Sequence, residues 1–335
     1  MIAIHNNKSH DLFHYRWIDY CDKNNIPYKL VNCYANDIIQ QLKDCSSLMW
    51  HYHQANPADI VMAKSLLFSL EQSGFKVFPD FNTAWHFDDK VAQKYLLEAL
   101  QIDLVPTWVF YDKKIASEWI ENTIFPKVFK LKGGAGSQNV QLVTTKRYAN
   151  LLAKKAFGNG FPAYDSWGSL KERYRKWRLG KTSFFDVAKG FFRLVNPPRY
   201  AKVMGKELNY LYFQEFIPNN DSDIRIVVID GKAFGIKRMN RKNDFRASGS
   251  GFILYDKASI DERFVKAAFA INRKLKAQCI AYDFVLDVTN KPLLIEISYG
   301  FANGGYDACT GYWDEKMNWS EGAFNPYAWM IEMMR

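Results

Sequence analysis

Short apolar runs alternate with amphipathic segments along the first 80 residues of the chain. The runs favour strands, and the segments between them carry apolar residues at helical spacing. This strand–helix–strand rhythm predicts a lobe built on a parallel sheet. The predicted strands are 1–4, 28–31, 48–52 and 76–78, and the predicted helices are 11–23, 37–43 and 58–73.

The rhythm changes after residue 86. A helical pattern over 88–100 is followed by a strand, a glycine-rich turn and a second strand between residues 126 and 143. Further along the chain, the pattern predicts strands at 210–217, 224–229, 233–236, 252–255, 280–286 and 292–297, with a helix over 261–276. The residues after the last of these strands are aromatic and lack a regular pattern, which predicts an irregular tail.

These patterns predict an α/β protein of several lobes. Single cores rarely grow beyond about 250 to 300 residues, so a chain of 335 residues is expected to place its site between lobes. We predict an N-terminal domain over 1–85, a second subdomain over 86–209 and a third over 210–335.

Composition narrows the class of protein. With 48% hydrophobic and 24% charged residues, the chain is typical of a folded globular protein. Its five cysteines are scattered and form no C-x-x-C pair, which argues against a disulfide framework or a thiolate zinc site and favours a reducing cytoplasm. No apolar run reaches the roughly 18 residues of a membrane span. We therefore expect a cytoplasmic protein, at most peripheral at the inner membrane face.

One segment carries the whole net charge of +10. Between Lys154 and Lys206 there are 13 Lys or Arg against 3 acids, and the rest of the chain has 32 of each. Within it, residues 163–199 mix cations with aromatic rings. Such a segment can rest on an anionic bilayer, bind an acidic polymer or RNA, or pack its phenylalanines onto the domain. Our hypothesis is that it recruits an anionic or membrane-tethered acceptor, such as an acidic glycan, and nucleic acid is the least expected partner.

The glycine-rich turn is a candidate phosphate-binding loop. Gly133, Gly134, Gly136 and Ser137 would let backbone N–H groups approach phosphate oxygens. The turn lacks the G-K-[ST] ending of a P-loop, so a plain glycine-rich hairpin remains an alternative. Lys130 on the preceding strand and Lys90, 40 residues earlier, would neutralise a triphosphate.

Two carboxylates are placed inside apolar strands near the end of the chain. Asp283 and Glu296 lie 13 residues apart, on strands that could be antiparallel neighbours. Because a buried charge is costly unless paired, the two acids suggest a shared cation, for which Mg²⁺ is the natural choice and Mn²⁺ the alternative. The other interpretation is that each acid pairs with a lysine or arginine.

The order of these pieces resembles the ATP-grasp fold, especially the ribosomal-protein glutamate ligases, with a more distant likeness to D-alanine:D-alanine ligases. The resemblance implies an N-terminal pre-ATP-grasp α/β lobe and a two-subdomain ATP-grasp domain, with the basic aromatic insert at about 154–206. The motifs that carry it are Asp89-Lys90, 105–107, 125–130 with the turn through Val140, 214–217, 223–225, 237–238, 244–248, Asp283 and Glu296.

The resemblance also implies roles for the site residues. Lys90 and Lys130 would grip the ATP phosphates under a lid formed by 133–137. The hinge that binds adenine would consist of Glu215, Phe216 and Ile217. Arg225 would stabilise the transferred phosphoryl group, supported by Lys237 or Arg238, with Arg246 nearer the acceptor. The metal ligands would be Asp283 and Glu296, with Ser298 standing where the family usually has Asn and with Asn303 as a substitute.

The implied activity is an ATP-dependent ligase that works through an acyl-phosphate. It would join the carboxylate of a small molecule, glycan or peptide to an amine, or to a thiol. A phosphotransferase and a nucleotide-binding module weakened by Ser298 are the alternatives. Among six histidines confined to the first 86 residues, His5 is the candidate acceptor-site residue because ligands bind at the carboxyl ends of parallel strands. His51 and His53 could share a role, although packed or exposed histidines are the simpler interpretation.

Overall fold

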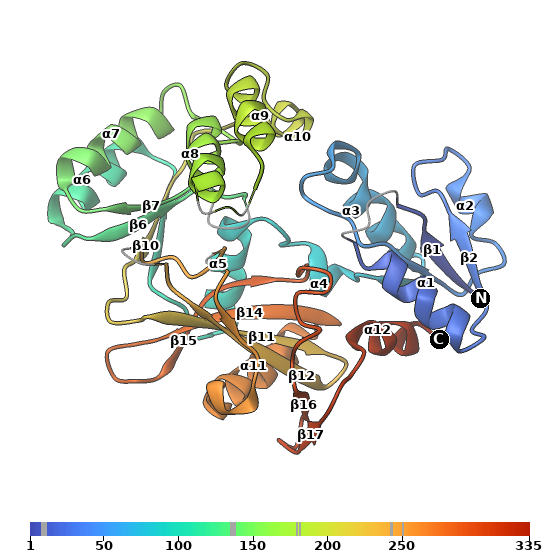
Figure 1. The fold of residues 1–335 in the computed structure, drawn as a ribbon. Helices are drawn as coiled ribbons and strands as arrows, with labels where there is room; N and C mark the ends of the chain where they lie inside the picture. Colours follow the sequence, from blue (N-terminus) through green and yellow to red (C-terminus); the bar gives the residue numbers. More distant parts are fainter. Residues whose placement is uncertain (8–11, 135–138, 179, 181, 242–243, 250) are drawn as a thin grey trace. The chain divides into compact units, whose positions relative to one another are not determined.

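The chain forms two compact units (Figure 1). The computed structural model describes residues 1–7, 12–134, 139–178, 180, 182–241, 244–249 and 251–335. The first unit contains Met1–Phe87, Leu96–Leu104 and Ile217–Arg335, and the second contains Asp88–Tyr95 and Val105–Phe216. The predicted helix start at residue 11 and the turn residues Gly136 and Ser137 lie outside the described residues. The three-part division drawn from the sequence stays a prediction.

The N-terminal part of the first unit is built on a parallel sheet, which confirms the prediction. Its strands β1 (Ile2–His5), β2 (Tyr28–Val31), β3 (Ser47–Met49) and β4 (Lys76–Phe78) run in the order β2-β1-β3-β4. The helices of this part are α1 (His14–Lys23), α2 (Ile38–Gln41), α3 (Pro57–Gln72) and α4 (Phe81–Ala84). Two of them are capped by a polar side chain: Asn56 accepts from the Ala58 N–H in α3, and Asp80 accepts from the Thr83 N–H in α4.

A larger antiparallel sheet completes the first unit (Figure 1). Its strand order is β15-β14-β11-β12-β16-β17, with β13 paired to β12. Helix α11 (Glu262–Leu275) packs on one face and is preceded by a short 3-10 turn at Lys257–Ser259. The strands are β11 (Ser222–Ile229), β12 (Lys232–Met239), β13 (Ile253–Leu254), β14 (Cys279–Leu286), β15 (Pro292–Ser298), β16 (Gly311–Asp314) and β17 (Trp319–Glu321).

The prediction of an irregular tail is wrong. The tail forms β16, β17 and a final helix, α12 (Pro326–Met334). Asn325 starts this helix by accepting from two backbone N–H groups, and Pro326 fits the first turn, where its missing N–H costs nothing. The helix is apolar on most sides, so its sequence shows no alternation of apolar and polar faces that would predict a helix. Its buried apolar residues share a cluster with residues of the parallel sheet. Its contacts include a 2.9 Å hydrogen bond from Ser47 Oγ to the Met334 carbonyl oxygen.

Side-chain alternation gives the large antiparallel sheet two different faces. On one face, Ile226 and Tyr282 pack in the same apolar cluster as the buried side of α11. On the other face, Val227 and Phe234 share a cluster with residues of α1 and α12. This second face is apolar only along part of its length, and the remainder carries charged residues.

The second unit contains an antiparallel sheet of β5 (Thr107–Phe110), β10 (Leu211–Glu215), β6 (Lys127–Lys130) and β7 (Val140–Val143), in that order. Helices α6 (Lys113–Asn122) and α7 (Lys146–Ala156) cover one face, where Phe129 and Phe213 are buried. The remaining elements are α5 (Lys90–Ala99), which begins in this unit, the paired strands β8 (Phe161–Pro162) and β9 (Lys206–Glu207), and helices α8 (Ser166–Arg178), α9 (Phe184–Val195) and α10 (Arg199–Met204).

Candidate active site

The described part of the glycine-rich turn is held by residues at the start of α5. The Gly134 N–H donates to Asp88 Oδ1 over 2.8 Å, and Lys90 Nζ donates to the Gly134 carbonyl oxygen over 2.9 Å. A Cβ atom on Gly133 would lie 3.2 Å from Asp88 Oδ2, so the close approach favours glycine at this position. The structure therefore places Lys90 beside Gly134, and the binding of phosphate by Lys90 stays a prediction. The anchoring role of Asp88 escaped the sequence interpretation, although its position two residues before Lys90 was a usable signal.

Lys130 lies on the face of its sheet opposite to α6 and α7. Its buried ammonium group donates to Gln214 Oε1 over 2.6 Å, and the Gln214 amide donates to Thr107 Oγ1 over 3.2 Å. Strands β6 and β10 are hydrogen-bonded neighbours, which is why residues far apart in the sequence meet here. From the sequence, Gln214 is assigned to a motif but to no role of its own. The structure shows that it positions the Lys130 ammonium group.

The predicted hinge begins with an ion pair. Glu215 is the register partner of Lys127, and its carboxylate accepts from Lys127 Nζ over 2.7 and 2.8 Å. The Glu215 N–H donates to the Pro106 carbonyl oxygen over 2.8 Å. The chain leaves the second unit at Phe216 and enters the first at Ile217. The predicted adenine contacts of Glu215, Phe216 and Ile217 stay a prediction.

A row of charged residues occupies one face of the large sheet in the first unit. Asp283 on β14 is the register partner of both Arg225 on β11 and Glu296 on β15. The expectation that the two acids lie on antiparallel neighbours is therefore confirmed. Arg225 binds Asp283 through two hydrogen bonds of 2.5 and 2.6 Å, and Arg238 Nη2 lies 3.1 Å from Asp283 Oδ2.

Asp223 extends this row and was missed as a site residue. It is the register partner of Arg238 and accepts two hydrogen bonds from its guanidinium, of 2.6 and 2.7 Å. Burial disfavours the ionised form of Asp283, but Arg225 and Arg238 outweigh this effect and hold the pKa of Asp283 well below its usual range. Burial likewise opposes the charge of Arg225, and Asp283 reverses that effect and raises the pKa of Arg225.

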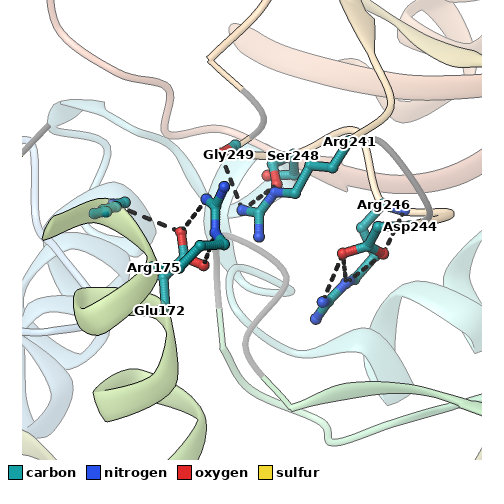
Figure 2. Close-up of polar contacts among 8 residues, drawn as sticks. Glu172, Arg175, Arg241, Asp244, Arg246, Ser248 and Gly249 are labelled. Atoms are coloured by element: carbon teal, nitrogen blue, oxygen red, sulfur yellow. Dashed lines mark hydrogen bonds and ion pairs between the residues drawn. The ribbon is translucent and has the colours of Figure 1, made fainter. Parts of the chain in front are cut away.

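The structure separates the two basic residues that the sequence offered as support for Arg225. Arg238 lies in the charged row, whereas Lys237 pairs with Ile224 and Leu254 on the other face of the sheet. Arg246 lies in the loop after β12, where its guanidinium is held by Asp244 over 2.8 to 3.1 Å (Figure 2). In the same loop, Arg241 donates to the Gly249 carbonyl oxygen over 2.9 Å.

The charged row can supply ligands to Mg²⁺. A carboxylate has about four acceptor positions, and the two arginines engage three of those on Asp283. Mg²⁺ takes one or two protein carboxylates and completes its shell with water and phosphate oxygens, which Asp283 and Glu296 together can satisfy. No group of three or more His, Cys, Asp and Glu side chains suited to a metal occurs among the residues that the structure describes. The ion-pair interpretation also holds for Asp283, because its arginine contacts are present.

The two neutral candidates near this row have other contacts. Ser298 Oγ donates to the Gly300 carbonyl oxygen over 2.9 Å, which leaves its lone pairs as possible ligands. Asn303 is the other candidate for the metal ligand that the family usually supplies as Asn. Its Oδ1 accepts from Arg16 Nε over 3.3 Å, and its amide donates to the Leu12 carbonyl oxygen. The structure thus ties Asn303 to the region around α1.

Two of the histidines are packed into the N-terminal part of the first unit. His5 lies at the end of β1, only 2% exposed, and its Nδ1 accepts from the Cys33 N–H over 3.1 Å. Burial, aided by the charge of His14, lowers the pKa of His5 to about 4. His51 accepts from the Phe13 N–H and stacks on the Phe13 ring at 3.7 Å. Both rings are therefore part of the core, and the role of His5 at an acceptor site stays a prediction.

Comparisons with known proteins agree with this arrangement. Residues 194–308 match the RimK-like ATP-grasp domain family. The alpha-aminoadipate–LysW ligase LysX of Saccharolobus solfataricus is 23% identical over 232 residues, which cover 69% of this chain and 68% of that protein. The structure of the D-cycloserine synthetase DcsG has a TM-score of 0.57 at 14% identity, covering 100% of this chain and 99% of that one. The ATP-grasp ligase PsnB, complexed with minimal precursor, Mg and ADP, has a TM-score of 0.55 at 10% identity, covering 100% and 98%.

The chain has the α/β ATP-grasp fold, with an N-terminal parallel sheet and antiparallel sheets beyond it. Residues 194–308 form a RimK-like ATP-grasp domain, and the chain is a distant homologue of LysX. No helix in the described part of the chain has both the length and the apolar character needed to cross a membrane.

Proposed function

We propose that the chain is an ATP- and Mg²⁺-dependent ligase that joins a carboxylate to an amine through an acyl-phosphate. The observation that carries this proposal is the charged row, in which Asp283 faces Glu296 on one neighbouring strand and Arg225 on the other. Its support includes the similarity to LysX, which is named as a ligase, and to PsnB, which was solved with Mg and ADP.

The residues divide the work between nucleotide and acyl group. Lys90 and Lys130 would bind the phosphates, with Gly133 offering its backbone N–H group, and 215–217 would hold adenine. Bound Mg²⁺, held by Asp283 and Glu296, would neutralise phosphate oxygens. A carboxylate is a poor electrophile until phosphorylation gives it a phosphate leaving group. Arg225, positioned by Asp283, would stabilise the charge on the moving phosphoryl group.

The similarity to other ligases supports a proposal for the chemical class of the substrates. LysX is named as a ligase of alpha-aminoadipate and LysW, and PsnB was solved in complex with a minimal precursor. We therefore propose a small-molecule, peptide or glycan carboxylate, with an amine as the attacking group. Arg246, whose guanidinium is oriented by Asp244 in the loop after β12, would lie on the acceptor side.

An ADP-release screen of amino acids crossed with carboxylates tests the proposal. Wild type should release ADP only in the presence of Mg²⁺, and hydroxylamine should trap the acyl-phosphate as a hydroxamate. Lys130→Ala and Glu296→Gln should each lower the rate by about a hundredfold, because the first removes a cation proposed to bind phosphate and the second removes the charge of a proposed Mg²⁺ ligand. Lys113→Ala and Glu121→Gln are matched controls at exposed positions and should leave the rate unchanged.

The screen also separates the alternative activities. ADP release that yields a stable phosphorylated product and no hydroxamate would identify a phosphotransferase. Nucleotide binding without ADP release for any pair of substrates would instead identify a binding module, in which the change to Ser298 has weakened catalysis.

A further inference from the structure

Helix α9 presents its apolar side to solvent. Residues 184, 185, 188, 191, 192 and 195 recur at the spacing of one helical face, and all six are apolar. A helix of a globular protein normally buries such a stripe. Here the exposed fractions are 62% for Phe184, 83% for Phe185, 59% for Phe191, 62% for Phe192 and 88% for Val195. We call these six residues the α9 stripe.

The packing of α9 on α8 fixes this orientation. The two helices contact each other, and on the side of α9 away from the stripe Val187 and Gly190 are buried, with Gly190 lying against Leu170. A Cβ atom on Gly190 would lie 2.9 Å from Leu170 Cδ1 and 3.0 Å from Arg173 Cδ, so glycine allows the helices to approach closely. The α9 stripe therefore faces outward because the other side of the helix is already committed to α8.

Helices α8 and α9 also carry an excess of cationic side chains. They contain seven Lys or Arg residues and two acids, a net charge of +5. Both acids are already neutralised, since Glu172 binds Arg175 and Asp186 binds Arg173, each over 2.7 Å (Figure 2 shows the first pair). Lys171 and Lys189 are both exposed. The surface thus combines exposed rings with uncompensated positive charge.

We propose that α8 and α9 bind the surface of an anionic phospholipid bilayer, with the α9 stripe inserted among the lipid headgroups and acyl chains. An amphipathic helix with phenylalanines on one side and cations beside them has the composition of interfacial membrane helices. Stacking on nucleic-acid bases would use ring faces, whereas this stripe continues through aliphatic Ala188 and Val195. An acidic polysaccharide would use the cations but gain little from an apolar stripe. This proposal does not depend on the ligase activity.

Co-sedimentation with vesicles tests the proposal on the full chain. Wild type should bind vesicles of equal phosphatidylcholine and phosphatidylglycerol, and should not bind phosphatidylcholine alone. Replacing Phe184 and Phe185 together by Ser should weaken binding by about tenfold or more, because two rings leave the acyl region. Replacing Lys171 and Lys189 together by Ala should weaken it by about 25-fold, at about fivefold per cation, and high salt should do the same.

Matched controls use residues outside the two helices. Ile115→Ser with Ile124→Ser removes two apolar side chains of similar exposure, 58% and 83%, and Lys113→Ala with Lys114→Ala removes two exposed cations. These control variants should bind anionic vesicles like wild type, and unchanged thermal unfolding of all four variants would show that each is folded. Absence of vesicle binding by wild type, or equal losses in test and control variants, would overturn the proposal. Binding of alginate or an RNA oligonucleotide without vesicle binding would overturn it in favour of a soluble polyanion.

Discussion

Helices α11 and α9 are similar in length and both carry phenylalanine-rich apolar stripes, yet the fold treats them in opposite ways. Six apolar residues of α11 are buried against the large antiparallel sheet, including Phe264 and Phe269. In α9 only Val187 and Gly190 are buried, and four phenylalanines face solvent. Periodicity predicts a helix and its apolar side in both cases. What covers that side depends on residues distant in sequence, and α11 is joined directly to a strand of the sheet it packs on.

The largest expected change in the free energy of unfolding comes from comparing a buried cation with an exposed one. Arg238→Ala would leave Asp223 and Asp283 as buried carboxylates that have lost a guanidinium, which should lower the free energy of unfolding by up to about 5 kcal/mol. Lys189→Ala, at an exposed position of α9, should change it by less than about 0.5 kcal/mol. Urea unfolding of both variants measures the difference. Equal effects would show that the charged row is hydrated rather than buried.

Much of the charged row could be predicted from the sequence, because the strongest signals in a sequence are local. An acid inside an apolar strand is conspicuous, and for that reason Asp283 and Glu296 were found and correctly expected on neighbouring antiparallel strands. The choice between Lys237 and Arg238 could not be made, since a shift of one residue moves a side chain to the other face of the sheet. Asp223 escaped notice because it lies at the end of its strand, where an acid is unremarkable.

The pattern of apolar and polar residues could not predict contacts between segments that are distant in the sequence. Helix α12 lies in a segment so rich in apolar residues that no polar face marks it, and its cover comes from α1, more than 300 residues earlier. The exposure of the α9 stripe was likewise unpredictable, because packing on the rest of the domain had been an equally acceptable interpretation. The close approach at Gly190, a contact between two helices, decides which side of α9 is buried.

The second expected effect tests the two stripes directly. Phe269→Ala should lower the free energy of unfolding by about 3 to 5 kcal/mol, because it leaves a cavity between α11 and the sheet. Phe185→Ala should change it by less than about 0.5 kcal/mol, because the ring is exposed before and after unfolding. Urea unfolding monitored by tryptophan fluorescence compares the pair. A cost above about 1 kcal/mol for Phe185→Ala would mean that the α9 stripe is packed within the protein.

The smallest of these effects concerns the buried His5, for which stability should depend on pH. The pKa of His5 is lowered from 6.5 to about 4 by burial, so between these values an unfolded chain binds a proton that the folded chain does not. Stability should be fully present above pH 6.5 and should fall by about 3 kcal/mol as the pH drops to 4. His5→Asn keeps an acceptor for the Cys33 N–H but cannot titrate, so its stability should fall less steeply over this range.

The matched control for His5 is His53→Asn, at a partly buried position in the same lobe. Urea unfolding at pH 7, 5.5 and 4.5 should show a smaller departure from the wild-type slope for this control than for His5→Asn, and any departure reflects the contribution of His53 to the lowered pKa of His51. The buried His51, whose pKa is also lowered by burial, should leave some acid sensitivity in both variants. If His5→Asn retains the full slope of wild type, the pKa of His5 is the same in the folded and the unfolded chain. That result would place His5 with the hydrated groups rather than with the buried ones, and would make it available to a ligand at the carboxyl end of β1.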